Sequence, residues 1–171
     1  MFVDTHYHFD FRPFIHDIED SFSRAVKAGV TDIIVPVVGI ENFERVYSLA
    51  QQYPHLYAAL GFHSLYIADF LSDYFAKLVA LLQQNSNKYK CVAIDEIGLD
   101  YFVTNAAVKQ QQALLIQQLQ LAKQYDLRVI LHSRKNHYQL AALLRRFDVP
   151  KKGVIHGFAG SLSQANAFLS V

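Results

Sequence analysis

Short, almost continuous apolar runs recur along the chain and predict β-strands. Each run contains about four to eight residues, many of them valine, isoleucine or leucine. Runs of this kind fit strands that are buried on both faces, as in a parallel sheet. They begin with a short apolar segment at residues 1–3 and continue at residues 31–38, 56–63, 91–98, 128–133 and 153–158.

The segments between these runs have a different apolar spacing, which predicts α-helices. Apolar residues recur there three, four, seven or eight positions apart, so that they share one face of a helix. The predicted apolar faces consist of Ile18, Phe22, Ala25 and Val26; Phe43, Val46, Leu49 and Ala50; Leu71, Phe75, Leu78, Val79 and Leu82; Val108, Leu115, Leu119 and Ala122; and Leu140, Leu143, Leu144 and Phe147.

The alternation of strand and helix, repeated about six times, predicts an α/β fold with a parallel sheet. Candidate functional residues follow most of the predicted strands, as they do in a TIM-type (β/α)8 barrel. A closed barrel of this type takes ~250 residues, and the chain has 171. We therefore expect an incomplete barrel of about six βα units that lacks the C-terminal part.

The composition predicts a single domain over residues 1–171. The 7 glycines and 4 prolines are scattered at turns and do not form a linker. No signal segment opens the chain and no apolar run approaches ~18 residues, which predicts a cytoplasmic protein that does not enter a membrane.

The single cysteine, Cys91, excludes an internal disulfide and is expected to pack in a buried strand. The glutamines at 110–112 and 117–118 are expected to form a solvated helix face.

Histidines and a glutamate recur at or near the ends of the predicted strands. In a parallel sheet these ends meet at one edge, and imidazole and carboxylate groups there can hold divalent metal ions. Each residue alone is more often a helix cap or a solvated loop residue. Several such groups buried together would be costly without a cation, which favours a metal site. The residues are His6, His8, His63, Glu96, His132 and His156.

Local positive charge offers a second kind of candidate. The formal net charge is only +1, so no general basic field attracts nucleic acid. Arg134 and Lys135 directly follow a predicted strand and could receive a phosphate beside the metal site. A solvated loop explains this pair equally well. Lys151 and Lys152 precede the last predicted strand, at the opposite end of the sheet, and are expected in a solvated loop.

Four ordered motifs resemble the successive signatures of the TatD-type metal-dependent deoxyribonucleases, which are amidohydrolase-like hydrolases. They lie at residues 4–10, 95–101, 131–134 and 156–161. The family's Gly-x-His-Pro signature is similar to residues 61–64, with Ser64 in place of proline. Asp95 stands where the family commonly has glycine.

The resemblance implies hydrolysis of DNA phosphodiester bonds with two divalent metal ions, Mg, Mn or Zn. Glu96 would bridge the ions and act in catalysis, and His63 would act on the substrate side. Arg134 and Tyr101 are expected to bind substrate. The implied metal ligands are His6 and His8 for one ion, His132 and His156 for the other, and Glu96 for both.

The chain departs from the family pattern because no Thr-Asp-x-Pro signature, which carries the family's last ligand aspartate, follows the sixth predicted strand. We therefore expect weaker binding of the first metal, and an open barrel edge that could self-associate or accept a complementing fragment. Two other functions stay open: an amidohydrolase acting on a small cyclic amide or ester, and an inactive chain or one that requires a partner. The native metal, the physiological substrate and the polarity on DNA do not follow from the sequence.

Overall fold

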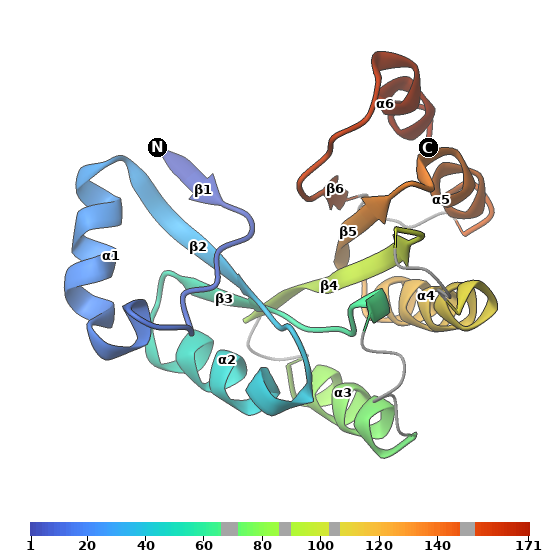
Figure 1. The fold of residues 1–171 in the computed structure, drawn as a ribbon. Helices are drawn as coiled ribbons and strands as arrows, with labels where there is room; N and C mark the ends of the chain where they lie inside the picture. The colour runs from blue at the N-terminus through green and yellow to red at the C-terminus, as the bar shows by residue number, and fades with distance from the viewer. Residues whose placement is uncertain (66–71, 86–89, 103–106, 148–152) are drawn as a thin grey trace.

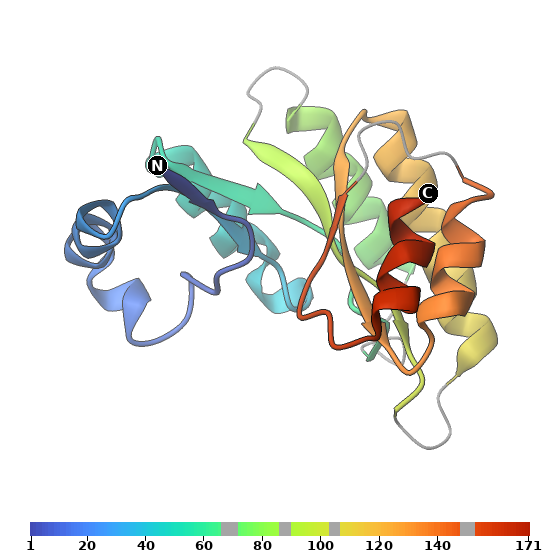
Figure 2. The ribbon, with the colours of Figure 1, turned by 90° about the horizontal axis from the view of Figure 1, so that it is seen from above.

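Six parallel strands form one curled sheet in the computed structural model, which describes residues 1–65, 72–85, 90–102, 107–147 and 153–171. Neighbours in the sheet follow the order of the chain from β1 to β6. The sheet curves like part of a barrel, with the helices on its outer side (Figures 1 and 2). The predicted α/β fold is confirmed. The strands are β1 (Phe2–Asp4), β2 (Val30–Pro36), β3 (Leu56–Ala59), β4 (Cys91–Asp100), β5 (Arg128–Arg134) and β6 (Gly153–Ile155).

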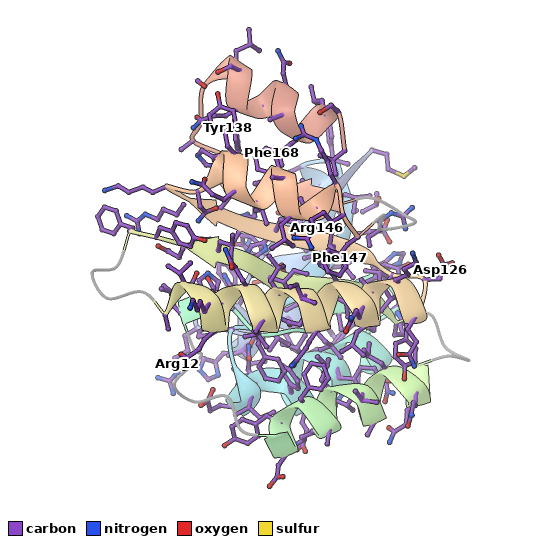
Figure 3. The ribbon with its side chains drawn as sticks, turned by 90° about the vertical axis from the view of Figure 1, so that its right-hand side faces the viewer. Arg12, Asp126, Tyr138, Arg146, Phe147 and Phe168 are labelled. Atoms are coloured by element: carbon purple, nitrogen blue, oxygen red, sulfur yellow. The ribbon has the colours of Figure 1, made fainter. Side chains whose placement is uncertain are left out.

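Helices connect successive strands and cover the convex face of the sheet. Figure 3 shows α3, α4, α5 and α6 side by side over this face. None of the described helices is long and apolar enough to cross a membrane. The helical elements are a 3-10 turn (Phe14–His16) and the α-helices α1 (Ile18–Lys27), α2 (Ile40–Gln52), α3 (Ser72–Asn85), α4 (Val108–Gln124), α5 (His137–Leu144) and α6 (Leu162–Leu169).

The core lies between these helices and the sheet, and it contains most of the predicted apolar faces. All four predicted positions of α2 are buried, as are Leu115 and Leu119 of α4. Val26 and Val108 differ, because they lie near helix ends and are 45% and 36% exposed. Leu71 lies outside the described residues. Cys91 is buried, as expected.

Several strands end earlier than their apolar runs. β3 stops at Ala59, yet the chain stays against β4, because the Asp95 N–H donates to the carbonyl of Leu60 at 3.2 Å. Gly61 follows, and a Cβ at this position would collide with the backbone carbonyl of Asp95. Only glycine therefore allows the segment that leads to His63 to pass so close to β4.

Two of the glutamines of α4 do not belong to the solvated face that their polarity suggested, whereas Gln110 and Gln117 are exposed as expected. Gln111 and Gln118 are only 3% and 1% exposed, and they point toward the sheet. Gln118 exchanges two hydrogen bonds with the peptide of Phe62, at 2.7 and 3.0 Å. Gln111 makes the same reciprocal pair with the backbone of Asp100, at 2.8 and 2.9 Å. The prediction was wrong for these two residues because backbone groups of the strand-end segments satisfy their amides.

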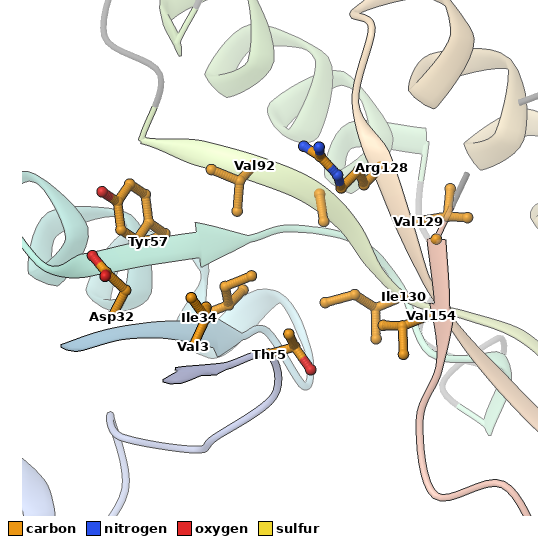
Figure 4. Close-up of a pocket in the computed structure, with 12 residues that line it drawn as sticks. Val3, Thr5, Asp32, Ile34, Tyr57, Val92, Arg128, Val129, Ile130 and Val154 are labelled. Carbon is orange, nitrogen blue, oxygen red and sulfur yellow. The ribbon is translucent and has the colours of Figure 1, made fainter. Parts of the chain in front are cut away.

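The concave face of the sheet encloses a hollow of about 570 Å³. Side chains from all six strands point into it (Figure 4), as inward residues do in a (β/α) barrel. Most of its lining is apolar, including Val3, Ile34, Val92, Ile130 and Val154. The candidate metal ligands lie elsewhere, toward the carboxyl edge of the sheet. Glu96 and His132 lie in the later halves of β4 and β5, and the other candidates follow their strands.

Candidate metal centre

Residues from the two ends of the described sheet meet at its carboxyl edge. The rings of His6, after β1, and His156, directly after β6, stack with centroids 3.7 Å apart and planes 18° from parallel. His8 lies edge-on to His6 with a centroid distance of 5.1 Å. Both residues follow β1, which ends at Asp4, so His6 and His8 lie outside the strand and strand alternation does not bring them together.

Glu96 lies between the two groups of histidines. Its Oε2 is 3.9 Å from Nε2 of His6, and its Oε1 is 3.2 Å from Nδ1 of His132. The ladder between β4 and β5 shifts register between Ile94 and Ile97, where β4 contains one extra residue. Such a bulge re-aims side chains, and Glu96 lies within it.

His63 completes the cluster on the side of β5. Its ring centroid is 4.4 Å from that of His132. One ligand atom from each of His63, Glu96 and His132 lies within 4.8 Å of the others, a spacing that suits a shared metal ion. The structure thus brings together all six residues that the sequence singled out, and it adds His63 to those that could bind metal directly.

The protonation states suit a cation. Burial lowers the pKa of His6, His8 and His156, and it lowers that of His63 to about 4. These rings are therefore neutral near pH 7, which is the form that binds metals. Burial opposes ionisation of Glu96, but the hydrogen bond to His132 and the nearby histidines lower its pKa to about 2. Glu96 is thus an ionised carboxylate beside four histidines whose pKa values are lowered.

Asp100, at the end of β4, contacts the ring nitrogen of His132 that does not face Glu96. Its Oδ2 is 2.9 Å from Nε2 of His132, while Oδ1 accepts a hydrogen bond from the N–H of Phe102. Burial opposes protonation of His132, yet its hydrogen bonds to Glu96 and Asp100 raise its pKa. Reasoning from the sequence did not assign Asp100 a role, although it lies in one of the quoted motifs.

Asp95 is a second carboxylate that was not predicted as part of the site. Its side chain is fully buried, and Oδ1 lies 3.5 Å from Nδ1 of His6. Among the described residues, neither oxygen of Asp95 has a hydrogen-bond partner, and neither does Nδ1 of His6 or His8. Burial, and then the charge of Glu96, raise the pKa of Asp95 well above its usual value. Unsatisfied donor atoms of this kind fit a centre that binds divalent cations.

A cavity of about 650 Å³ opens beside the cluster. His63, Glu96, His132 and His156 contribute to its wall, together with Arg134 and Lys135. The predicted substrate residue Arg134 therefore lies where it can meet a ligand. Tyr101 contacts α4, where its hydroxyl accepts a hydrogen bond from Gln112 at 3.2 Å. Lys151 and Lys152 lie outside the described residues.

A curled parallel sheet with this histidine–carboxylate cluster at its carboxyl edge defines a protein of the (β/α)-barrel metal-dependent hydrolase class. The chain matches the family described as TatD related DNase over residues 3–171, and it belongs to that family. The expected family resemblance is thereby confirmed.

Individual relatives support this assignment. The chain is 49% identical over 170 residues to the uncharacterized metal-dependent hydrolase YjjV of Escherichia coli, covering 99% of this chain and 65% of that protein. The crystal structure of YjjV superposes with a TM-score of 0.92 at 50% identity, covering 99% of this chain and 64% of that chain. The deoxyribonuclease Tat-D of Schizosaccharomyces pombe is 32% identical over 157 residues, covering 86% and 50%. The 3'-5' ssDNA/RNA exonuclease TatD of Salmonella typhimurium is 28% identical over 155 residues, covering 90% and 58%. The chain thus spans about half to two thirds of the length of these relatives.

Proposed function

We propose that this chain carries most of the site of a metal-dependent phosphodiesterase that hydrolyses single-stranded nucleic acid. The observation that carries the proposal is the position of Glu96, whose two oxygens face two different histidine groups, His6 at 3.9 Å and His132 at 3.2 Å. A carboxylate in this position can serve two cations at once. Relatives named as a deoxyribonuclease and as an ssDNA/RNA exonuclease support nucleic acid as the substrate.

The resemblance to the TatD family divides the donor set into two halves, although His156 stacks on His6 in the structure. His6 and His8 would hold one divalent ion, His132 and His156 the other, and Glu96 both. Two such ions supply activation of water and stabilisation of charge on a transferring phosphoryl group. The histidine pKa values lowered by burial keep four of the rings neutral, so their nitrogens are available as ligands at physiological pH.

The remaining polar residues of the cavity act on the substrate. Arg134 provides a planar guanidinium at the cavity wall, suited to a phosphate oxygen. The N–H of Leu65 donates to Nδ1 of His63 at 3.1 Å, so the neutral ring carries its proton on Nε2. His63 can therefore donate a hydrogen bond from Nε2 to a substrate oxygen. Binding a metal through Nε2 would instead require the other tautomer and the loss of the hydrogen bond from Leu65.

The test compares Glu96→Ala with Glu44→Ala, which removes a glutamate that is exposed on α2 and paired with Lys77. Each variant is titrated with Mn²⁺ by calorimetry and assayed for cleavage of single-stranded DNA and RNA. We expect Glu96→Ala to lower both affinity and cleavage by ~100-fold or more, because it removes a ligand shared by two ions. Glu44→Ala should match the unchanged protein, and chelator should abolish cleavage.

Two results would refute the proposal. Undiminished cleavage by Glu96→Ala would remove the bridging role. Turnover of cyclic amides or esters, with no cleavage of nucleic acid by the unchanged protein, would instead favour an amidohydrolase.

A further inference from the structure

An exposed aromatic ring lies against two cations that line the cavity. The guanidinium carbon of Arg134 is 3.7 Å from the ring centroid of Phe102, and Nζ of Lys135 is 4.6 Å from it. Phe102 nevertheless remains 50% exposed. We call Phe102, Arg134 and Lys135 the rim platform.

The backbone of the rim platform is tied to the metal centre. One carboxylate, Asp100, accepts from the N–H of Phe102 at 2.8 Å and meets Nε2 of His132 at 2.9 Å. The carbonyl of Arg134 accepts from the N–H of Tyr101 at 2.9 Å and from the buried Asn136 amide at 2.8 Å. The distance from the candidate metal ligands to the platform is therefore fixed by short hydrogen bonds.

No salt bridge among the described residues neutralises the charge of the rim platform. Within the described residues, neither Arg134 nor Lys135 forms a salt bridge, although the two cations follow one another in the sequence. Both line the same cavity as Glu96 and His132. Two positive groups gathered at one half-exposed aromatic ring suit a ligand that is both anionic and planar. A nucleotide combines a phosphate with an aromatic base, whereas a simple anion would leave the ring unused.

We propose that the rim platform binds a nucleotide next to the scissile phosphate of a single strand. Arg134 and Lys135 would hold a phosphate of that nucleotide, and its base would stack on the Phe102 ring or on the Arg134 guanidinium plane. Base stacking on an aromatic or guanidinium face accepts every base, so this subsite would give affinity for single strands without sequence preference. DNA and RNA share this chemistry. The inference rests on the proposed function, because it assumes a nucleic-acid substrate.

The experiment measures binding in chelator, so that no strand is cut and metal loading does not contribute. Fluorescence anisotropy compares thymidine tetranucleotides, uridine tetranucleotides and abasic DNA strands of equal length at several salt concentrations. The variants are Phe102→Leu, Phe102→Tyr and Arg134→Gln/Lys135→Gln. The control is Tyr57→Leu, which removes the ring of another aromatic–lysine pair, 4.9 Å from Lys90 at the amino end of β3. Circular dichroism melts establish that each variant is folded.

The unchanged protein should bind base-bearing strands about tenfold or more tightly than abasic strands, as expected for one stacked base. Phe102→Leu should lose this preference, while Phe102→Tyr and Tyr57→Leu keep it. The double glutamine variant should weaken binding to both strand types and reduce the salt slope by about 0.7 per cation removed. A similar preference for uridine strands would show that RNA is also accepted.

The inference is overturned if Phe102→Leu discriminates base-bearing from abasic strands as well as the unchanged protein does. It is also overturned if the unchanged protein shows no discrimination at all, since Phe102 would then only fix its neighbours. Failure of the proposed function is seen separately, as the absence of nucleic-acid cleavage when Mn²⁺ is supplied.

Discussion

Nε2 of His132 lies 2.9 Å from Oδ2 of Asp100, and Nδ1 of the same ring faces Glu96 at 3.2 Å. A carboxylate on one nitrogen fixes the orientation of the ring and leaves the other nitrogen for a metal. The side chain of Asp100 is only 1% exposed, so solvent does not compete for this contact.

Asp100→Asn should therefore weaken metal binding without removing a proposed ligand. The carboxylate accepts from both the Phe102 N–H and His132, whereas an amide has a single oxygen acceptor. We expect the affinity for Mn²⁺ to fall about 10- to 100-fold, measured by calorimetry. The control is Asp20→Asn on α1, where the side chain is 61% exposed. Equal affinity in the two variants would show that Asp100 does not orient His132.

Gln118→Leu should destabilise the protein although leucine suits a buried helix face. The substitution removes both hydrogen bonds to the peptide of Phe62, which lies directly before His63. The expected loss is about 2–4 kcal/mol in the free energy of unfolding, measured by urea denaturation. Gln117→Leu, at an exposed neighbouring position, should change it by less than about 0.5 kcal/mol. A neutral effect of Gln118→Leu would mean that water or backbone readily replaces the amide.

Asp95→Asn should stabilise the metal-free protein, and Asp10→Asn should destabilise it. Both carboxyl groups are buried, but Oδ2 of Asp10 accepts from Asn42 and Arg45 at 2.9 and 2.8 Å. Asp95 has no hydrogen-bond partner among the described residues, and burial raises its pKa. An asparagine at 95 avoids a buried charge, whereas one at 10 loses a charge that is paired.

The pH dependence of this pair follows from the sign of the pKa shift. Because the pKa of Asp95 is higher in the folded than in the unfolded protein, its contribution to stability is present below about pH 4 and lost as pH rises. The advantage of Asp95→Asn should thus grow between pH 5 and pH 8, in melts recorded with chelator. A constant difference across this range would indicate that Asp95 is not protonated in the fold.

Cys91 should resist alkylation in the folded protein. Burial raises its pKa to about 12 from an ordinary value of 9.0, so the reactive thiolate is about a thousandfold scarcer at pH 8. Iodoacetamide should label it slowly under native conditions and rapidly in urea, as followed by mass spectrometry. Fast native labelling would mean that β4 opens readily.

The raised pKa of Cys91 also predicts that the free energy of unfolding falls as pH rises from about 9 toward 12.

The sequence predicted the parallel α/β sheet and a cluster of candidate residues at one edge of it, because both depend on local apolar runs and on parallel topology. It placed the chemistry at strand ends, and a parallel sheet necessarily brings such ends to one edge. What it missed depends on contacts between distant segments. Phe102 lies just beyond a quoted motif, but its partners Arg134 and Lys135 belong to the next strand end.

The two buried glutamines were misjudged for the same reason. Polarity alone predicts exposure for Gln111 and Gln118, and only the fold shows which backbone groups they meet. Their spacing of seven residues was a usable signal, since two helical turns bring both to one face. That face also contains the buried Leu115 and Ala122, so it was already the side predicted to face the sheet.

The seven-residue separation of Gln111 and Gln118 lets α4 set the distance between two segments of the site. Each amide imitates a peptide group, presenting one donor and one acceptor to the chain, a pairing that only glutamine and asparagine side chains provide. The helix rise sets their attachment points about 10 Å apart, at Asp100 on one strand end and at Phe62 before His63. The positions of Asp100 and of the segment before His63 are thus set by a helix behind the sheet. Repositioning the centre would require changing this helix as well as the residues that face the cavity.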